Sequence, residues 1–307
     1  MTNSVDVVVV AYHAHDRLRH CLESLREHPP SSRPLTVVVV DNGDDPDTTS
    51  LVHGVLPNAD VLEPHENLGF ARATNLGIRR GNGKHVLVLN PDTELFAGTL
   101  DRLLAVLDER PEVVIVGPKL VRDDGSLDHA ARRSFPTPLG ALAHFAGIGR
   151  VMGGGPLAQY RAPEVEAGLV DAVNGAFMLM RRSAIEAVGL FDEGYWMYME
   201  DLDLCYRVKQ AGGLTWYEPT AEALHVKHGT SGAFRSPRLV WAFHYGMFRF
   251  YRKHYAPLRS SALTALVYAG IAIRAVGTLL VSVLARPAIA ATLGGPRRRL
   301  RESRTRV

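Results

Sequence analysis

The sequence predicts an α/β protein with a mainly parallel central sheet flanked by helices, and three observations carry this expectation. Apolar β-branched runs alternate with segments of helical periodicity between residues 5 and 116, an order typical of parallel sheets. These runs are apolar throughout, as expected of strands that helices cover on both faces. With 307 residues, 46% of them hydrophobic, the chain can bury a full core in one or two domains.

In the first part of the chain, each strand is placed by its apolar run and each helix by the spacing of its apolar residues. The run at residues 5–11 is bounded by polar residues, and the helical spacing that follows ends at Pro29. Strands are expected at residues 5–11, 35–40, 61–62, 85–89 and 113–116, and helices at 18–25, 69–80 and 100–107.

In the second part, residues 122–169 are rich in Gly, Pro and Ala, which predicts a loop-rich connection. Strands are then expected at 170–173, 176–180, 215–217 and 222–225, and helices at 183–188, from residue 200, at 241–255 and at 262–285.

Two acids, Asp41 and Asp92, come directly after predicted strands, and Tyr12 follows the first one. Ligands of parallel α/β sheets bind beyond the carboxyl ends of the strands, so these acids predict a shared site. The alternative is two independent turns, because Asp-Asn-Gly and Asn-Pro-Asp both form turns readily.

The densest functional signal is at residues 195–207, where an aromatic and methionine run meets Glu200, Asp201 and Asp203. Crowded carboxylates beside apolar surface raise one another's pKa, which suits a general base acting on a hydroxyl group. The structural alternative is that Asp201 caps the helix while Asp203 pairs with Arg207 four residues later.

Two weaker patterns also predict site residues. Asn67 is placed to cap the next helix, whose start and Arg72 can face phosphates, although a solvated Arg72 is an equal alternative. His225 and His228 precede a glycine and are candidate metal ligands, with a hydrogen-bonded loop as the alternative.

Composition excludes several classes of protein. Seven arginines and one acid lie from Arg286 onward, and the remainder carries 28 basic and 31 acidic residues, so the main body is not a nucleic-acid binder by charge. Cys21 and Cys205 are far apart, which predicts neither a disulfide framework nor a zinc site. The polar start of the chain predicts no signal peptide.

The C-terminal part predicts attachment to a membrane surface. Residues 262–285 are long enough to span a bilayer, but Arg274 near their centre favours a helix lying in the membrane plane. The basic tail would then meet anionic headgroups. The alternative is a helix packed on the catalytic domain with a solvated tail.

Together, these motifs resemble the inverting family 2 glycosyltransferases of the GT-A fold, and among them the bacterial rhamnosyltransferase group. The resemblance covers residues 5–255 and rests on Asp41, Asn67-Leu68-Gly69-Phe70-Ala71, Asn90-Pro91-Asp92, Asn174-Gly175-Ala176, Glu200-Asp201 and His225. It implies a catalytic domain at residues 1–235, with a nucleotide-binding half at 1–118 and an acceptor half at 119–235, and a membrane-associated segment at 236–307.

The resemblance also implies the roles of the site residues. Asp201 is expected to be the catalytic base, Asp41 to accept a hydrogen bond from the pyrimidine base, and Asp92 with His225 to hold Mg²⁺ or Mn²⁺. The residues expected around the donor nucleotide are Ala11, Tyr12, Asp41, Asn67, Gly69, Arg72 and Asn90. Those expected around the donor sugar or acceptor are Asn174, Gly175, Ala176, Trp196, Glu200 and His228.

The sequence departs from the family pattern at two positions. Asn90 stands where the usual metal-binding triplet begins with an acid, which leaves one fewer charge for the cation. His228 stands where many relatives have glycine, so the choice between His225 and His228 stays open.

The implied activity is metal-dependent transfer of L-rhamnose from dTDP-rhamnose to a polyprenyl-linked or glycan acceptor at the cytoplasmic face of the cell membrane. A single inverting displacement needs one base and no covalent intermediate, and a divalent cation neutralises the diphosphate leaving group. The alternatives are a UDP-hexose-dependent enzyme of the same fold and an inactive nucleotide-sugar-binding or scaffold subunit.

Overall fold

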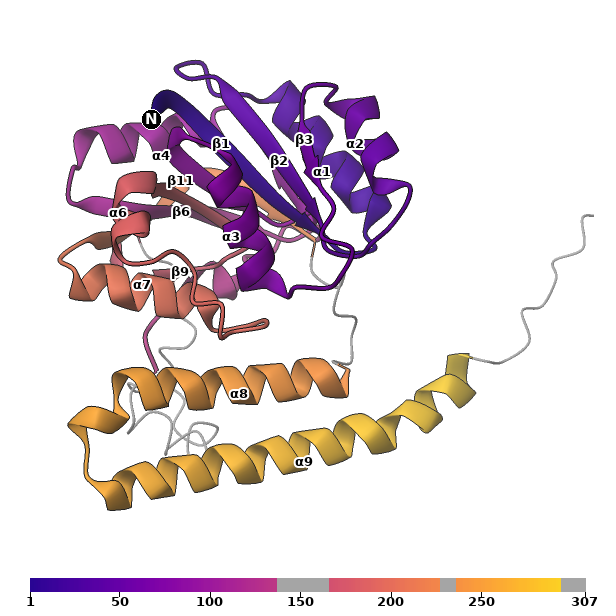
Figure 1. The fold of residues 1–307 in the computed structure, drawn as a ribbon, viewed down its shortest axis with the longest axis vertical. Helices are drawn as coiled ribbons and strands as arrows, with labels where there is room; N and C mark the ends of the chain where they lie inside the picture. The colour runs from indigo at the N-terminus through magenta and orange to yellow at the C-terminus, as the bar shows by residue number, and fades with distance from the viewer. Residues whose placement is uncertain (137–165, 227–235, 294–307) are drawn as a thin grey trace, which may run out of the picture.

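The structure, a computed structural model, describes residues 1–136, 166–226 and 236–293, with side chains described up to residue 283 (Figure 1). The strands are β1 (Thr2–Ala11), β2 (Leu35–Asp41), β3 (Asp60–Leu62), β4 (Gly83–Leu89), β5 (Thr93–Leu95), β6 (Val113–Val121), β7 (Arg132–Arg133), β8 (Gly168–Val170), β9 (Ala172–Val173), β10 (Phe177–Arg181) and β11 (Leu214–His225). The helices are α1 (His15–Glu27), α2 (Thr48–Val55), α3 (Phe70–Arg80), α4 (Thr99–Glu109), α6 (Arg182–Ala187), α7 (Glu200–Gln210), α8 (Pro237–His254) and α9 (Ser261–Leu293).

The main sheet of the described part has nine strands in the order β3-β2-β1-β4-β10-β6-β11-β5, with β8 also paired to β11. The first four are parallel, so their carboxyl ends form one edge, and Ala11 at the end of β1 is in register with Asp41 at the end of β2. β10 runs antiparallel between β4 and β6, and β11 is parallel to β6. A second sheet pairs β7 with β9.

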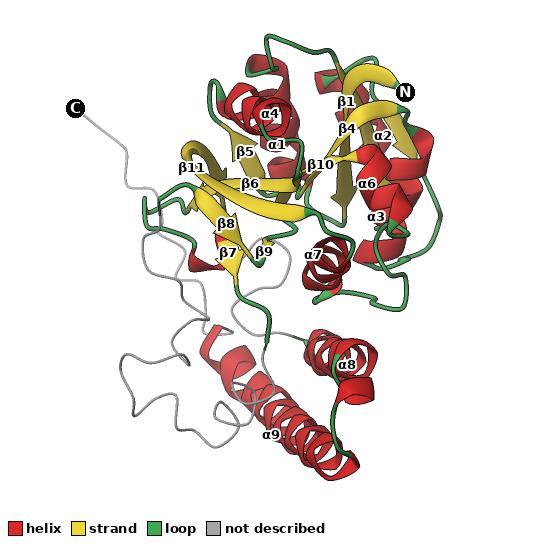
Figure 2. Cartoon of the chain, turned by 90° about the vertical axis from the view of Figure 1, so that its left-hand side faces the viewer, coloured by secondary structure: helices red, strands yellow, loops and turns green. Residues whose placement is uncertain are grey.

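Helices cover both faces of this sheet (Figures 1 and 2), which explains why its central strands are apolar throughout. Val7 and Val9 of β1 pack in the core formed with α1, α2 and α4, whereas Val8 packs in the core formed with α3, α6 and α7. The predicted central sheet flanked by helices is confirmed.

Three elements were not predicted from the sequence: α2, β5 and β7. One difference concerns the two strands expected at 215–217 and 222–225. They form the single strand β11, whose pairing with β6 shifts register between Glu218 and Glu222. An irregularity of this kind interrupts the apolar pattern without ending the strand.

The C-terminal helices lie beside each other below the sheet domain, with α8 between that domain and α9 (Figures 1 and 2). Tyr251 of α8 packs with Val267 and Ile271 of α9. Within the described residues, Ser261–Val283 is the one helix long and apolar enough to cross a membrane, and only 17% of its most apolar stretch is buried.

Candidate functional site

The carboxyl edge of the parallel strands is organised by the loop after β2. Asn42 donates its backbone N–H to Ala11 O at 2.8 Å. The carboxylate of Asp41, which is 2% exposed, accepts backbone N–H bonds from Gly43 at 3.1 Å and Asp45 at 2.8 Å. The turn-forming interpretation of Asp41 is therefore correct as geometry, and the same bonds fix its carboxylate at the strand edge.

A second loop joins the first through amide side chains. Asn42 Oδ1 accepts the backbone N–H of Leu68 at 2.8 Å, and its Nδ2 donates to Asn67 Oδ1 at 3.3 Å. The prediction that Asn67 caps α3 is wrong, because the helix begins at Phe70 with Gly69 at the cap position. Asn67 instead accepts the backbone N–H of Gly69 at 2.9 Å and so shapes the loop before the helix.

Gly69 links these two loops to the acidic segment at residues 195–207. Its φ of +78° is a left-handed conformation, and a Cβ added there would lie 2.4 Å from Trp196. Phe70 donates its backbone N–H to Trp196 O at 2.7 Å. Only glycine allows the start of α3 to approach Trp196 so closely, whereas Arg72 on the same helix is exposed.

Trp196 itself is partly buried and carries two features of a binding surface. Its indole Nε1 is buried with no hydrogen-bond partner among the described residues, and the guanidinium of Arg238 lies 4.0 Å from the ring centroid. At the other side of the edge, Tyr12 is 42% exposed and its ring centroid lies 4.5 Å from that of His13.

Asp92 and His225 lie together, as predicted. The pairing of β5 with β11 puts His225 opposite Thr93, so His225 Nε2 comes 3.7 Å from Asp92 Oδ1. Both residues are buried, burial raises the pKa of Asp92, and Asp92 Oδ1 has no hydrogen-bond partner among the described residues.

This pair fits a divalent cation. A buried carboxylate oxygen without a partner is costly unless a cation or donor binds it, and an oxygen beside an imidazole nitrogen is a donor set that Mn²⁺ accepts. Within residues 1–136, 166–226 and 236–293 no group of three or more potential ligand side chains is found, so waters or a bound molecule would have to supply the remaining ligands. His228 lies outside the described residues.

Asp201 is held from three directions. Its Oδ2 accepts the backbone N–H of Gly175 at 2.9 Å and pairs with Arg133, and its Oδ1 accepts the backbone N–H of Leu202 at 2.8 Å. The alternative in which Asp201 caps the helix is wrong, since Met199 is the cap residue. Asp201 is 5% exposed.

The loop before β10 supports this arrangement and connects it to the strand edge. Asn174 Oδ1 accepts the backbone N–H of Ala176 at 2.9 Å, and Ala176 O accepts the backbone N–H of Asn90 at 2.9 Å. Gly175 lies so close to Asp201 that an added Cβ would be 3.2 Å from Asp201 Oδ2. The structure therefore joins these predicted residues to Asp201 on one side and to the β4 end on the other.

The three carboxylates of α7 have different environments. Burial, and then the charge of Asp201, raise the pKa of Glu200 to about 8. Burial alone would raise the pKa of Asp203, but bonds from His254, Arg207 and Lys253 hold it below its usual range. Of Glu200 and Asp203, only Glu200 therefore has a raised pKa. The sequence pattern predicted raised pKa values for the crowded acids in general and did not distinguish between them.

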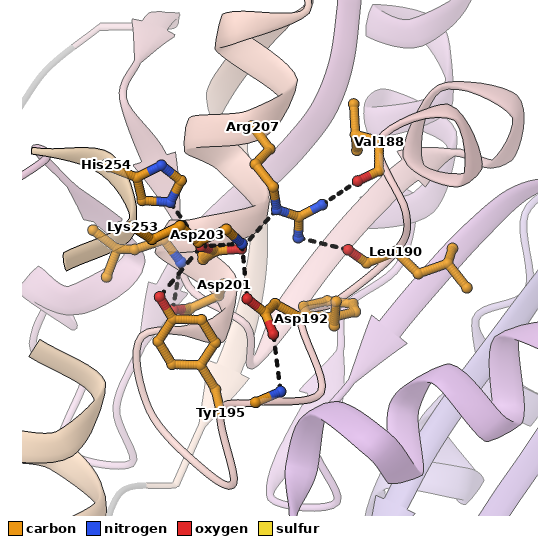
Figure 3. Close-up of polar contacts among 12 residues, drawn as sticks. Val188, Leu190, Asp192, Tyr195, Asp201, Asp203, Arg207, Lys253 and His254 are labelled. Carbon is orange, nitrogen blue, oxygen red and sulfur yellow. Dashed lines mark hydrogen bonds and ion pairs between the residues drawn. The ribbon is translucent and has the colours of Figure 1, made fainter. Parts of the chain in front are cut away.

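Asp203 is a structural residue, as the alternative interpretation proposed (Figure 3). It is fully buried and accepts bonds from Arg207 Nε at 2.6 Å, His254 Nε2 at 2.7 Å, Lys253 Nζ at 2.9 Å and the Tyr195 hydroxyl at 3.2 Å. Its contacts join α7 to α8. Glu200 and Asp201 are then the carboxylates of α7 that remain candidates for a catalytic role.

Three residues near the site were missed by sequence reasoning. Asp128 Oδ2 lies 2.9 Å from His225 Nδ1, Arg133 pairs with Asp201, and Arg17 donates to Val226 O at 2.9 Å. Asp128 and Arg133 belong to the region interpreted as a loop-rich connection, where no periodicity or motif marks them.

Comparison with known proteins adds family information. The profile described as Glycosyl transferase family 2 matches residues 6–189. An N-acetylglucosaminyl-diphospho-decaprenol L-rhamnosyltransferase of Mycobacterium tuberculosis is 35% identical over 260 residues, which cover 80% of this chain and 82% of that protein.

Two solved structures are similar in fold. GalNAc-T7 with UDP, GalNAc and Mn²⁺ aligns with a TM-score of 0.61 at 14% identity, over 81% of this chain and only 47% of that longer chain. A mannosyltransferase from Pyrobaculum calidifontis with GDP-Man and Mn²⁺ aligns with a TM-score of 0.56 at 19% identity, over 94% of this chain and 77% of that one. These likenesses confirm the predicted GT-A fold.

Proposed function

The chain belongs to glycosyl transferase family 2, and from this we propose that it transfers L-rhamnose from dTDP-rhamnose to a hydroxyl of a polyprenyl-diphosphate-linked sugar, with inversion. The observation that carries the proposal is the 35% identity, over 80% of the chain, to an enzyme named as a rhamnosyltransferase of a lipid-linked sugar. The mycobacterial enzyme is named for the transfer of L-rhamnose to a polyprenyl-diphosphate-linked amino sugar, and the proposal takes the sugar and the acceptor class from it.

Asp201 is the proposed general base. The bonds from Gly175, Leu202 and Arg133 hold its carboxylate in place. Gly175 and Arg133 both bind Oδ2, so Oδ1, which accepts the Leu202 N–H, is the oxygen with a lone pair left for the acceptor hydroxyl. As that hydroxyl attacks the anomeric carbon from the face opposite the diphosphate, Asp201 takes its proton. One displacement of this kind inverts the anomeric centre.

The donor nucleotide is proposed to lie along the carboxyl edge of the parallel strands. There Asp41 is fixed to accept a hydrogen bond from the base, and Ala11, Tyr12 and Asn90 border the same edge. Asp92 and His225 would hold Mg²⁺ or Mn²⁺, which when bound neutralises charge developing on the diphosphate. The start of α3 and Arg72 face the same donor in this proposal.

The acceptor and the donor sugar are proposed to lie between the residue 174–176 loop and the acidic segment. Trp196 offers an aromatic face to a sugar ring, and Glu200 lies beside the base. On this view, the nucleotide half spans about residues 1–118, the acceptor half about 119–235, and the membrane-associated segment 236–307.

Membrane attachment is proposed to occur through α9 lying in the plane of the cytoplasmic leaflet. α8 runs along α9 and carries the exposed residue Arg252, which a bilayer core would not accept. The outer face of α9 exposes Leu266, Ile273, Val276 and Leu280, each more than half exposed. The arginine-rich tail, which was predicted to meet anionic headgroups, lies beyond the described residues.

The proposal is tested by transfer assays with dTDP-rhamnose and a panel of UDP-hexoses, using a polyprenyl-diphosphate-linked amino sugar as acceptor. We expect transfer from dTDP-rhamnose, a product of inverted anomeric configuration by NMR, and a fall of about 10²- to 10⁴-fold in Asp201→Asn. Asp171→Asn, which changes a half-buried acid that pairs with Lys209 and can keep its bond from the Phe135 backbone N–H, is the matched control.

Each alternative gives a different result in the same assay. Preference for a UDP-hexose would show that the donor is not dTDP-rhamnose and would leave the proposed mechanism unchanged. Turnover by a folded Asp201→Asn variant at the wild-type rate would show that Asp201 is not the general base. An absence of transfer with every donor, together with nucleotide binding, would favour an inactive binding subunit.

A further inference from the structure

Three buried side chains lie in a row at the edge of the site. Asp128 is 0% exposed, and its Oδ2 lies 2.9 Å from His225 Nδ1. The other nitrogen of the ring, Nε2, lies 3.7 Å from Asp92 Oδ1. The row therefore runs from one carboxylate through the imidazole to the carboxylate oxygen that has no hydrogen-bond partner among the described residues.

The two nitrogens of the His225 ring make different kinds of contact with the two carboxylates. At 2.9 Å the contact with Asp128 is a hydrogen bond, and because a carboxylate only accepts, the proton sits on Nδ1. At 3.7 Å the contact with Asp92 is too long for a hydrogen bond. The Nε2 lone pair and the Asp92 oxygen thus face a common space, and two ligands about 2.1 Å from one cation are separated by a distance of this order.

We propose that Asp128 is a positioning residue for the cation site, which accepts the Nδ1 proton of His225 and so directs the Nε2 lone pair to the space beside Asp92. The inference rests on the proposed cation-dependent function. A histidine that binds a metal through one nitrogen commonly donates its other N–H to a carboxylate, which fixes the tautomer and the ring orientation.

The Oδ1 oxygen of Asp128 has a structural role, and it also lies 3.9 Å from Arg122 Nη2. Oδ1 accepts the backbone N–H of Ala130 at 3.0 Å and caps the 3₁₀ turn His129–Ala131. Oδ2 makes the separate contact with His225. An asparagine can keep the cap through its oxygen while presenting an NH₂ group to His225, so Asp128→Asn separates the two roles.

The same short segment also contacts the proposed base. Arg133, five residues after Asp128, pairs with Asp201, and Asn174 donates its backbone N–H to Ala131 O at 3.1 Å. The side chain of Asp128 is therefore bound to the His225 ring, and the chain that follows Asp128 is fixed through β7, whose Arg133 pairs with Asp201. This anchoring explains how a residue in a loop-rich region can fix the orientation of a buried ring.

The first measurement uses the wild-type protein alone. Histidine ¹⁵N NMR at a pH where the imidazole is neutral, with the His225 signals identified by their loss in His225→Gln, reports which nitrogen carries the proton. We expect the proton on Nδ1. A proton on Nε2 would overturn the inference, whatever the stability of any Asp128 variant.

The second measurement is Mn²⁺ binding in the presence of dTDP, followed by the EPR signal of free Mn²⁺. Asp128→Asn is expected to bind Mn²⁺ about 10- to 100-fold more weakly, while metal-free dTDP binding and the thermal midpoint stay near wild-type values. Asp124→Asn is the matched control, because Asp124 is an exposed acid of the same loop that only holds its own turn through Ser126.

The outcomes separate this inference from the proposed function. Wild-type Mn²⁺ affinity in Asp128→Asn, with affinity lost in Asp92→Asn, would overturn the role of Asp128 and leave the cation site standing. No Mn²⁺ binding by the wild-type protein, even with dTDP, would overturn the cation site and this role together.

Discussion

His254 Nε2 lies 2.7 Å from Asp203 Oδ1, and this contact joins the acidic helix α7 to α8. Asp203 is fully buried and has three further partners (Figure 3). Although it belongs to the crowded group of acids in the sequence, its contacts hold the two helices together. Removing one member of such a network leaves the others unpaired in a buried position.

We expect Asp203→Asn to lower the free energy of unfolding by about 3–5 kcal/mol, because the charges of Arg207 and Lys253 lose their common partner. Urea denaturation monitored by circular dichroism measures this. Asp171→Asn removes the ion pair of this half-buried residue with the exposed Lys209, while its amide oxygen can still accept the backbone N–H of Phe135, and it is expected to cost less than about 1 kcal/mol. Equal losses in the two variants would contradict the network role of Asp203.

Glu200 makes stability depend on pH. Burial and the charge of Asp201 raise its pKa to about 8, so between about pH 4.3 and pH 8 the folded protein binds a proton that the unfolded chain releases. Stability then falls as pH rises through this window, with a slope approaching about 1.4 kcal/mol per pH unit.

We expect Glu200→Gln to remove this slope and to be more stable than wild type at pH 8, because the amide carries no charge to bury. Urea denaturation at pH 5, 6, 7 and 8 compares the two proteins. Parallel curves for wild type and variant would mean that Glu200 is ionised in the folded protein.

Gly69→Ala is expected to destabilise the protein by more than the cost of its positive φ alone. Gly98 has nearly the same φ, +77° against +78°, but an added Cβ there would meet nothing within 4 Å. Gly98, with ψ of −2°, lies in the left-handed helical region, so Gly98→Ala measures the strain of that region alone, about 1–3 kcal/mol. The excess loss in Gly69→Ala then measures the clash with Trp196 together with the strain of its ψ of 172°, which essentially only glycine adopts at this φ. Thermal unfolding of both variants tests this, and equal losses would show that Trp196 moves aside freely.

Arg133→Ala is expected to lower kcat by about 10- to 100-fold, because the Asp201 carboxylate loses one of the groups that orient it. Mn²⁺ binding should stay unchanged, since Arg133 contacts neither Asp92 nor His225. Arg110→Ala, which removes a guanidinium packed 4.3 Å from the Trp216 ring centroid, is the control. A loss confined to KM would instead place Arg133 in acceptor binding.

Ile273→Glu is expected to weaken binding to anionic vesicles by about tenfold or more, because this residue, 74% exposed on α9, would no longer bury an apolar side chain. Vesicle co-sedimentation measures this. Leu169→Glu changes a similarly exposed residue, at 59%, on the sheet domain and should leave binding unchanged. Equal effects would point to a different membrane-facing surface.

Much of the fold was predictable because its central strands are continuous apolar runs. The run beginning at Val5 and the one ending at Val40 are covered on both faces, so burial alone marks them. Helix α2 was missed because its eight residues contain β-branched side chains and a glycine, and β5 because three residues show no periodicity.

The site was predictable only where its residues lie in motifs. Asp92 and His225 were expected to act together, and the β5–β11 pairing brings them to 3.7 Å. Asp128 and Arg133 reach their partners across sequence separations of 97 and 68 residues, and no local pattern reports such contacts. Asn67 was misassigned because the cap depends on the φ of Gly69, which sequence spacing does not show.

The ion pairs that Asp192 and Asp203 make with α8 fix the position of this helix relative to the acidic segment. Asp192 pairs with Arg249 and Lys253, and Asp203 pairs with Lys253 and His254, while α8 packs along α9. On the proposed placement of α9 at a lipid surface, the distance of Asp201 from the bilayer would be set by these packed helices and not by a flexible tether.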